Sequence, residues 1–253
     1  MLLVYPDYTD RDMKGKVSGG NYSEGLASIS AVLKQGGHHV ELLHLLYLHE
    51  ETEFKNKLRE KGEFDIIGFS IRTTAFPDAQ LYIRWTREVW PDVFIICGSY
   101  HCTLVPGEVL AVPEVDCVCI GDGEYAELEL CDKMSAGEDY TSIESLWFKN
   151  GDGSFIKNPV RPLFADLDRI PIPDFDLFDY DNLESSKVNT AIVMMSRGCF
   201  FNVPQPSTLD MKTFLCIPVG PQRQQCAVFR QAGVRSNHSH KKFTILLNRQ
   251  NID

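Results

Sequence analysis

The sequence predicts an α/β fold: a doubly wound sheet of five parallel strands, a small β-hairpin extension and an incomplete second domain. Within residues 1–138, short apolar segments alternate with helix-like segments, the order that builds a parallel sheet covered by helices on both faces. Residues 66–69 are apolar at successive positions, as in a strand buried on both faces. The 253 residues suffice for one complete hydrophobic core and part of a second.

Each element of the predicted sheet has its own signal in the sequence. Five segments have the length and apolar content of strands: residues 2–5, 40–43, 64–70, 93–97 and 116–120. Four segments have the periodicity or charge spacing of helices: residues 26–33, 50–61, 77–90 and 124–134. Gly36 and Gly37 supply the positive φ that ends the first helix. We therefore expect strands and helices to alternate through this region.

The remaining residues predict smaller units. Residues 145–149 and 154–157 flank Asn150-Gly151-Asp152-Gly153, a typical hairpin turn. The chain then divides into five parts. They are a wound domain (residues 1–138), a hairpin extension (139–158), a proline-containing packed linker (159–189), the start of a second domain (190–202) and a tail that does not continue the pattern of that domain (203–253). We expect the tail to be disordered, because it shows no sustained periodicity.

Composition excludes several classes of function. The net charge of −10 argues against nucleic acid as a partner, since phosphate binding needs clustered Lys and Arg. There is no apolar run of about 18–20 residues and no signal-peptide pattern, so we expect a cytoplasmic protein without a membrane partner. The eight cysteines have neither disulfide-scaffold nor zinc spacing. We expect buried reduced thiols, with Cys117 and Cys119 on one strand face and Val118 on the other.

Four loops at the carboxyl ends of the strands form the candidate site. Ligands of open parallel sheets bind at this edge, and small or hydroxyl-bearing residues let a flat ligand approach the backbone. The candidate binding residues are Ser70, Thr73, Thr74, Gly98, Ser99, His101, Gly121, Asp122, Gly123 and Glu124. Any one such loop, taken alone, is explained better by turn formation. Four at one edge favour a ligand platform.

Residues 196–199, Ser-Arg-Gly-Cys, complete a longer pattern. It consists of an ordered series of segments: residues 68–70, 73–74, 98–101, 116–124, 161–173 and 196–199. Their order and spacing resemble the cobalamin-binding radical S-adenosylmethionine (radical SAM) family over residues 1–202. The resemblance implies a flavodoxin- or Rossmann-like cobalamin-binding fold. It also implies a corrin ring over the strand ends, with its nucleotide tail between the sheet and a helix. Residues that would contact the cofactor are Ser70, Gly98, His101, Gly121 and Gly123.

The sequence departs from this family at both metal centres. Many cobalamin domains present Asp-x-His-x-x-Gly after the first strand, but residues 10–15 carry Asp12 at the histidine position. We therefore expect no histidine ligand to cobalt from this loop. Intact relatives use Cys-x3-Cys-x2-Cys to hold a [4Fe–4S] cluster that binds S-adenosylmethionine. Here Cys199 is the one remaining cluster-type metal ligand, because Val203 and Pro206 replace the other two cysteines.

We interpret the chain as a cobalamin-binding module whose radical SAM domain is interrupted, so we expect no radical chemistry from it alone. The tail resembles translation in a shifted frame, caused by a sequencing error, an unspliced segment or a real truncation. Two alternatives remain open: a structural or interaction domain that binds no corrin, and a nucleotide-binding domain. Asp122 and Glu124 disfavour the latter, because they would repel phosphate. A turn-stabilising role for His101 is also open.

Overall fold

A computed structural model describes residues 1–8, 20–163, 166–179, 183, 190–191 and 244–245. Its main sheet has seven strands in the order β2-β1-β3-β4-β5-β6-β7. The first five pair in parallel: β1 (Leu2–Pro6), β2 (Glu41–Leu45), β3 (Ile66–Ser70), β4 (Phe94–Gly98) and β5 (Cys117–Cys119). The predicted doubly wound parallel sheet is confirmed.

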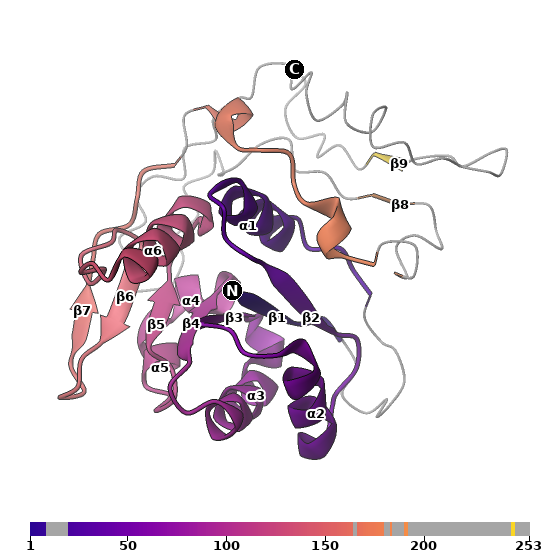
Figure 1. Ribbon diagram of the computed structural model, residues 1–253, viewed down its shortest axis with the longest axis horizontal. Coiled ribbons are helices and arrows are strands. Elements are labelled where there is room, and N and C mark those ends of the chain that lie inside the picture. Colours follow the sequence, from indigo (N-terminus) through magenta and orange to yellow (C-terminus); the bar gives the residue numbers. More distant parts are fainter. Residues whose placement is uncertain (9–19, 164–165, 180–182, 184–189, 192–243, 246–253) are drawn as a thin grey trace, which may run out of the picture.

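Helices cover both faces of the sheet (Figure 1). The four predicted helices are α1 (Glu24–Gln35), α2 (Glu51–Lys61), α3 (Phe76–Val89) and α6 (Glu124–Ala136). Helices α1 and α6 contact each other on one face, and α2 and α3 contact each other on the other. Two five-residue helices, α4 (Tyr100–Leu104) and α5 (Pro106–Leu110), were not predicted. Five residues are too few to display helical periodicity in a sequence.

Two apolar cores lie on the two faces of the sheet. Ile67 contributes to the core under α2 and α3, and its neighbour Ile66 contributes to the core under α1 and α6. Val118 and its neighbours Cys117 and Cys119 divide between the cores in the same way, because successive side chains of a strand point to opposite faces. The predicted orientation of the two cysteines is confirmed.

Local signals fix the ends of the helices. The Ser23 side chain accepts a hydrogen bond from the Leu26 backbone N–H and caps α1. Gly37 follows this helix at φ +90° and Gly137 ends α6 at φ +67°, a backbone region that glycine adopts without steric cost. These residues set where α1 begins and where α1 and α6 end.

The predicted hairpin belongs to the sheet itself. Strands β6 (Leu146–Lys149) and β7 (Phe155–Lys157) pair with each other, and β6 pairs antiparallel with β5. Trp147 Nε1 donates to the Asn158 carbonyl, and Lys157 Nζ lies 5.1 Å from the centre of the Trp147 ring. The hairpin thus extends the parallel sheet by two antiparallel strands.

The described part of the predicted linker packs against α1 and the sheet. Asp174 Oδ2 lies 2.6 Å from both Ser30 Oγ and Lys34 Nζ, and the Asp174 N–H donates to the Ala27 carbonyl. Phe178 is buried beside Tyr5. Short 3₁₀ turns form at Leu167–Arg169 and Phe175–Leu177. The linker is anchored through Asp174 and Phe178.

Little of the chain beyond residue 183 falls within the described ranges. Two-residue strands β8 (Thr190–Ala191) and β9 (Thr244–Ile245) pair in parallel as a separate sheet. The expectations for Cys199, for the cluster loop and for most of the tail lie outside the described residues, as does the residue 10–15 pattern.

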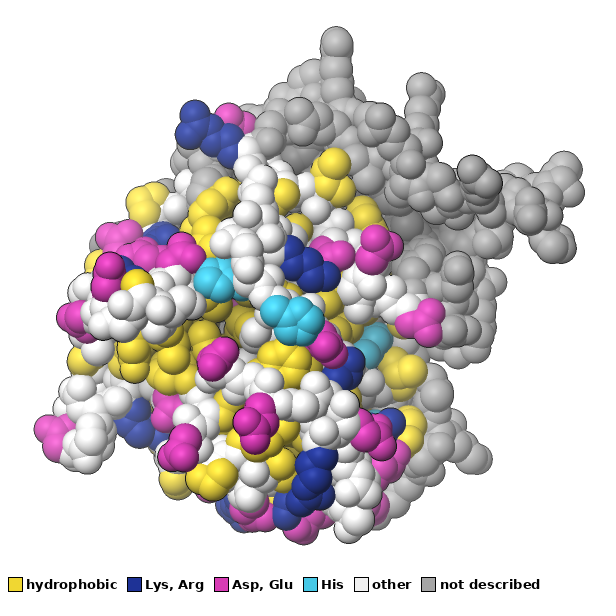
Figure 2. Space-filling view, viewed as in Figure 1, with side chains coloured by type: hydrophobic (Ala, Val, Ile, Leu, Met, Phe, Trp, Pro, Cys, Tyr) yellow, Lys and Arg dark blue, Asp and Glu magenta, His cyan; other side chains and the backbone are white. Residues whose placement is uncertain are grey.

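The described cysteines are buried reduced thiols, as expected, and charged side chains lie on the surface of the helices. The five described cysteines, Cys97, Cys102, Cys117, Cys119 and Cys131, are free and buried. Burial is the largest cause that raises the pKa of the Cys131 thiol to about 12. Acidic and basic side chains are intermixed over α2 and α3 (Figure 2), where Lys55 pairs with Glu51 and Glu88. No helix among the described residues has the length and hydropathy of a membrane span.

Candidate functional site at the carboxyl edge of the sheet

The sheet changes winding direction between β1 and β3. Strand β1 lies between β2 and β3; α1 follows β1 on one face, and α3 follows β3 on the other. Connections that diverge in this way open a crevice at the carboxyl ends of the strands, where ligands of such folds bind. The described residues of the candidate loops after β1, β3, β4 and β5 follow the ends of these strands at this edge.

Backbone hydrogen bonds join the loops after β3 and β4. Ser70 and Gly98, the last residues of the two strands, are in register. The Ile71 N–H donates to the Gly98 carbonyl at 2.9 Å, and the His101 N–H donates to the Ile71 carbonyl at 3.3 Å. The two loops therefore form one continuous edge.

Thr103 connects this edge to the loop after β5. Its hydroxyl accepts a hydrogen bond from the Gly121 N–H at 3.1 Å and donates to the Ser99 carbonyl at 3.2 Å. The three loops, residues 70–74, 98–101 and 121–123, are called the rim below. Thr103 holds its parts together.

Ser99 adopts a backbone conformation that is rare for any residue with a side chain. Its φ is +84° and its ψ is −169°, a region that is essentially restricted to glycine and costs about 1–3 kcal/mol otherwise. The strained residue lies between the end of β4 and the start of α4. Such strain persists only where surrounding contacts enforce it, and the Thr103 bonds to the Ser99 carbonyl supply them.

The rim exposes backbone where it lacks side chains. A Cβ on Gly98 would meet no atom nearer than Cys119 Cβ at 3.8 Å. Gly121 is exposed, with φ +78°. Thr73 and Thr74 are also exposed, in the 3₁₀ turn Thr73–Ala75. A flat ligand can approach the backbone closely at such positions.

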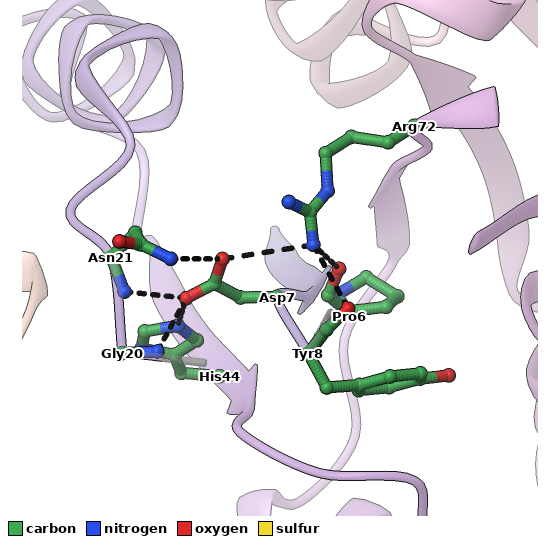
Figure 3. A network of polar contacts seen from close by, with 7 residues as sticks. All are labelled: Pro6, Asp7, Tyr8, Gly20, Asn21, His44 and Arg72. Carbon is green, nitrogen blue, oxygen red and sulfur yellow. Dashed lines mark hydrogen bonds and ion pairs between the residues drawn. The ribbon is translucent and has the colours of Figure 1, made fainter. Parts of the chain in front are cut away.

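Asp7 joins the end of β1 to Gly20 and Asn21, the residues that lead into α1 (Figure 3). Its carboxylate is fully buried, and Oδ2 accepts from the Gly20 N–H at 2.7 Å and the Asn21 N–H at 2.5 Å. The His44 imidazole on β2 lies 3.1 Å from the same oxygen. Burial alone would raise the pKa of Asp7, but the hydrogen bonds outweigh it and lower the pKa. Asp7 is therefore a fixed anion at the end of β1.

Arg72 bridges the ends of β1 and β3. Its Nη2 donates to the Pro6 and Tyr8 carbonyls at 3.2 Å each and lies 3.7 Å from Asp7 Oδ1 (Figure 3). The guanidinium thus offsets the Asp7 charge at the point where the sheet changes winding direction. It thereby joins residues 6–8 to the rim.

Three predicted binding residues are buried rather than accessible: His101, Gly123 and Glu124. The His101 ring is 5% exposed and its centre lies 4.2 Å from that of Phe76, while Nε2 lies 3.9 Å from Glu108 Oε2. Burial is the main cause that lowers the pKa of His101, which favours the neutral ring. Gly123 and Glu124 are buried, and Asp122 is half-buried. Ser70, Gly98, Ser99, Thr73, Thr74 and Gly121 form the accessible part.

Several side chains at this edge of the sheet are not predicted from the sequence. His44 and Arg72 meet Asp7 only because the sheet order places β2 and β3 on either side of β1. Glu127 on α6 is buried although acidic. Its burial could have been predicted from its position one helical turn before Cys131, on the face that packs on the sheet.

Among the described residues, no three His, Cys, Asp or Glu side chains are grouped to hold a metal ion.

The chain has recognisable relatives. It is 32% identical over 205 residues to an uncharacterised methyltransferase of Pyrococcus horikoshii, covering 80% of this chain and 44% of that protein. It is 27% identical over 211 residues to the anaerobic magnesium-protoporphyrin IX monomethyl ester cyclase of Rubrivivax gelatinosus, covering 79% and 37%. The chain thus spans less than half the length of either relative.

Solved structures share the fold. The radical S-adenosylmethionine methyltransferase TsrM of Kitasatospora setae, with cobalamin and a [4Fe–4S] cluster bound, has a TM-score of 0.57 at 17% identity, over 78% of this chain and 39% of that one. The cobalamin-dependent radical enzyme OxsB, with aqua-cobalamin and S-adenosylmethionine bound, has a TM-score of 0.67 at 18% identity, over 93% and 32%. The family model described as B12 binding domain matches residues 11–131. This part of the chain therefore belongs to the B12 binding domain family.

Proposed function

We propose that the chain binds cobalamin at the carboxyl edge of its sheet, as the cofactor-binding part of a cobalamin-dependent radical SAM protein. The observation that carries the proposal is the accessible backbone at Gly98, Ser99 and Gly121, within a domain of the B12 binding family. The relatives and solved structures are named for methyl transfer, cyclisation and radical chemistry. We therefore also propose that the whole protein, of which this chain is the cofactor-binding part, carries out a cobalamin-dependent radical reaction.

The residues present fit a large, flat cofactor. Gly98 leaves a space that a side chain would fill, and the rim keeps the neighbouring Ser99 in a strained conformation. Ser70 and the Thr73-Thr74 pair place hydroxyl groups on the same edge, where they can donate to the amide side chains of a corrin. The site thus combines an open backbone with polar edges.

Each group of the chain has a separate role in this proposal. When bound, cobalamin would supply a cobalt centre that assists methyl transfer or rearrangement. Gly98 and Gly121 give the ring access to the backbone, while Ser70, Thr73 and Thr74 orient its polar edge. Asp7 holds Gly20 beside the end of β1, and Arg72 joins that end to the rim. This chain performs binding, and the radical step belongs to a complete radical SAM domain.

The binding test uses the full 253-residue chain and hydroxocobalamin. We expect the cofactor to elute with the protein from a sizing column and its visible spectrum to change on binding. The Gly98→Val variant fills the open position at the end of β4 and should lower affinity at least tenfold. The matched control, Gly107→Val on α5, adds the same side chain at a position where no atom lies within 4 Å of the new Cβ and should bind normally.

Free passage of hydroxocobalamin past the folded protein would reject the proposal and leave a structural or interaction domain. Equal affinity of the Gly98→Val and wild-type proteins would reject the rim as the site. Thermal unfolding of both variants is the folding control, because neither substitution meets a close contact at its Cβ.

A further inference from the structure

Phe178 is the residue through which the linker packs on the ends of β1 and β2. Its side chain is 3% exposed. The centre of its ring lies 5.5 Å from that of His44 on β2 and 6.3 Å from that of Tyr5 on β1. The ring centre of Tyr22, which precedes α1, lies 5.1 Å away. All three contacts are edge-on, an arrangement that stabilises aromatic pairs.

His44 joins this aromatic cluster to the charged groups at the end of β1. Its ring stacks on that of Tyr5, with centres 5.1 Å apart and planes 20° apart, and the Phe178 ring meets it at 87°. Its Nε2 lies 3.1 Å from Oδ2 of the buried Asp7. Packing and a hydrogen bond therefore fix the same imidazole.

Residues 20–22 are held by both parts of this arrangement. The N–H groups of Gly20 and Asn21 donate to Asp7 Oδ2 at 2.7 and 2.5 Å. Tyr22, the next residue, packs on Phe178. The linker and Asp7 thus position the same short segment at the carboxyl edge of the sheet.

Arg72 extends the contacts to the rim. Its Nη2 lies 3.7 Å from Asp7 Oδ1 (Figure 3), and Thr73 and Thr74 follow it directly. A continuous series of contacts therefore runs from the linker through His44 and Asp7 to a part of the candidate cofactor site. Substitutions along such a series can change binding without touching the ligand.

The simpler interpretation is that Phe178 only fills the core. Phe148 provides the comparison, because it is the same residue type, is also 3% exposed and belongs to the same apolar core. It lies on β6, near the opposite edge of the sheet from β2, with its ring centre 5.7 Å from that of Tyr140. A residue that only fills the core affects stability alone, whereas a positioning residue also affects the site.

We propose that Phe178 is a positioning residue for the candidate cofactor site, and that it acts through His44 on Asp7 and hence on residues 20–21 and Arg72. As far as cofactor affinity is concerned, this inference rests on the proposed function. It makes the linker a part of the site. Because the linker precedes the expected start of the second domain at residue 190, the site is coupled to the segment that connects the two domains.

The first test needs no ligand. Because Asp7 accepts from the Gly20 and Asn21 N–H groups, backbone hydrogen exchange at these two residues reports their positioning. Phe178→Ala should speed this exchange about threefold or more, since local opening sets the exchange rate. Phe178→Leu retains most of the side-chain volume and should exchange like wild type. Phe148→Ala is the matched control and should leave both groups unchanged.

The second test measures the affinity of the full chain for hydroxocobalamin. Phe178→Ala should weaken binding about three- to tenfold, whereas Phe178→Leu and Phe148→Ala should bind like wild type. A double-mutant cycle with His44→Ala tests the route. Once His44 is truncated, Phe178→Ala should cause no further loss of affinity.

The outcomes separate this inference from the proposed function. A wild-type chain that does not retain hydroxocobalamin rejects the proposed function, while the exchange rates of Gly20 and Asn21 still decide whether Phe178 positions them. Unchanged exchange in Phe178→Ala, or equal losses of affinity in Phe178→Ala and Phe148→Ala, reject the positioning role. Additive losses in the double mutant reject the route through His44. Thermal unfolding without ligand shows whether each variant is folded.

Discussion

The imidazole of His44 on β2 donates to the buried carboxylate of Asp7 after β1, with Nε2 and Oδ2 3.1 Å apart. Two backbone N–H groups, of Gly20 and Asn21, share that oxygen. Asp7→Ala would leave these donors without their acceptor, so we expect a loss of about 2–4 kcal/mol of unfolding free energy. Urea denaturation measures it, with the exposed Asp92→Ala as control; equal midpoints would show that the network contributes nothing.

The Asp7 network also predicts acid sensitivity. The pKa of Asp7 is lower in the folded protein than its ordinary value of 3.8. The stabilisation is therefore complete above that value and is lost as the pH falls through the folded pKa. The difference in unfolding free energy between wild type and Asp7→Asn should shrink from pH 6 toward pH 2. A difference that stays constant over this range would contradict the assignment.

Glu127 predicts the opposite pH dependence. Its pKa is raised from 4.5 to about 8 in the folded protein, so the unfolded chain loses the proton first as the pH rises. Its contribution to stability falls between these two values and then levels off. Glu127→Gln should remove this slope and be more stable than wild type at pH 8. Parallel stability curves for the two proteins from pH 5 to pH 8 would refute the prediction.

Much of this architecture could be predicted because its signals are local. Apolar segments such as residues 66–69 identify strands within a few residues, and Gly37 marks a helix end. The contacts of Asp7 with His44 and Arg72 could not be predicted, since they depend on strand order across 37 and 65 positions. The pairing of β6 with β5 depends on tertiary structure in the same way.

The candidate site was predicted only in outline for a related reason. The loops at one edge follow from the alternation of elements, but side-chain direction follows from packing. His101 has the composition of a ligand residue, yet its ring packs on Phe76. Glu127 reads as an ordinary surface acid, yet α6 presents it to the sheet together with Leu130.

Asp174 predicts how firmly the linker is attached. Its carboxylate contacts Ser30 and Lys34, both on α1. Asp174→Ala should lower the unfolding free energy by about 1–2 kcal/mol, because Lys34 is partly exposed and its share is small. The exposed neighbour Asp176→Ala is the control in the same urea titration. A larger loss at Asp176 than at Asp174 would contradict the anchoring role.

The missing cysteines predict the metal content of the chain. Val203 and Pro206 stand where a Cys-x3-Cys-x2-Cys loop beginning at Cys199 would have thiolates, and one thiolate does not hold a [4Fe–4S] cluster. After anaerobic reconstitution, iron and sulfide should remain well below four atoms of each per chain. Cys199→Ser should show the same background. A stoichiometric cluster that disappears in Cys199→Ser would overturn this reading of the sequence.

The strained backbone of Ser99 predicts that a glycine at this position would stabilise the fold. At φ +84° and ψ −169°, a glycine would relieve the steric strain, whereas Ser99→Ala would keep it. Glycine also gains conformational freedom in the unfolded chain, so the net gain of Ser99→Gly should be about 1 kcal/mol. If the rigid rim preorganises the site, Ser99→Gly should bind hydroxocobalamin more weakly than Ser99→Ala despite its higher melting temperature. A variant that is both more stable and equally tight in binding would show that the strained residue has no part in recognition.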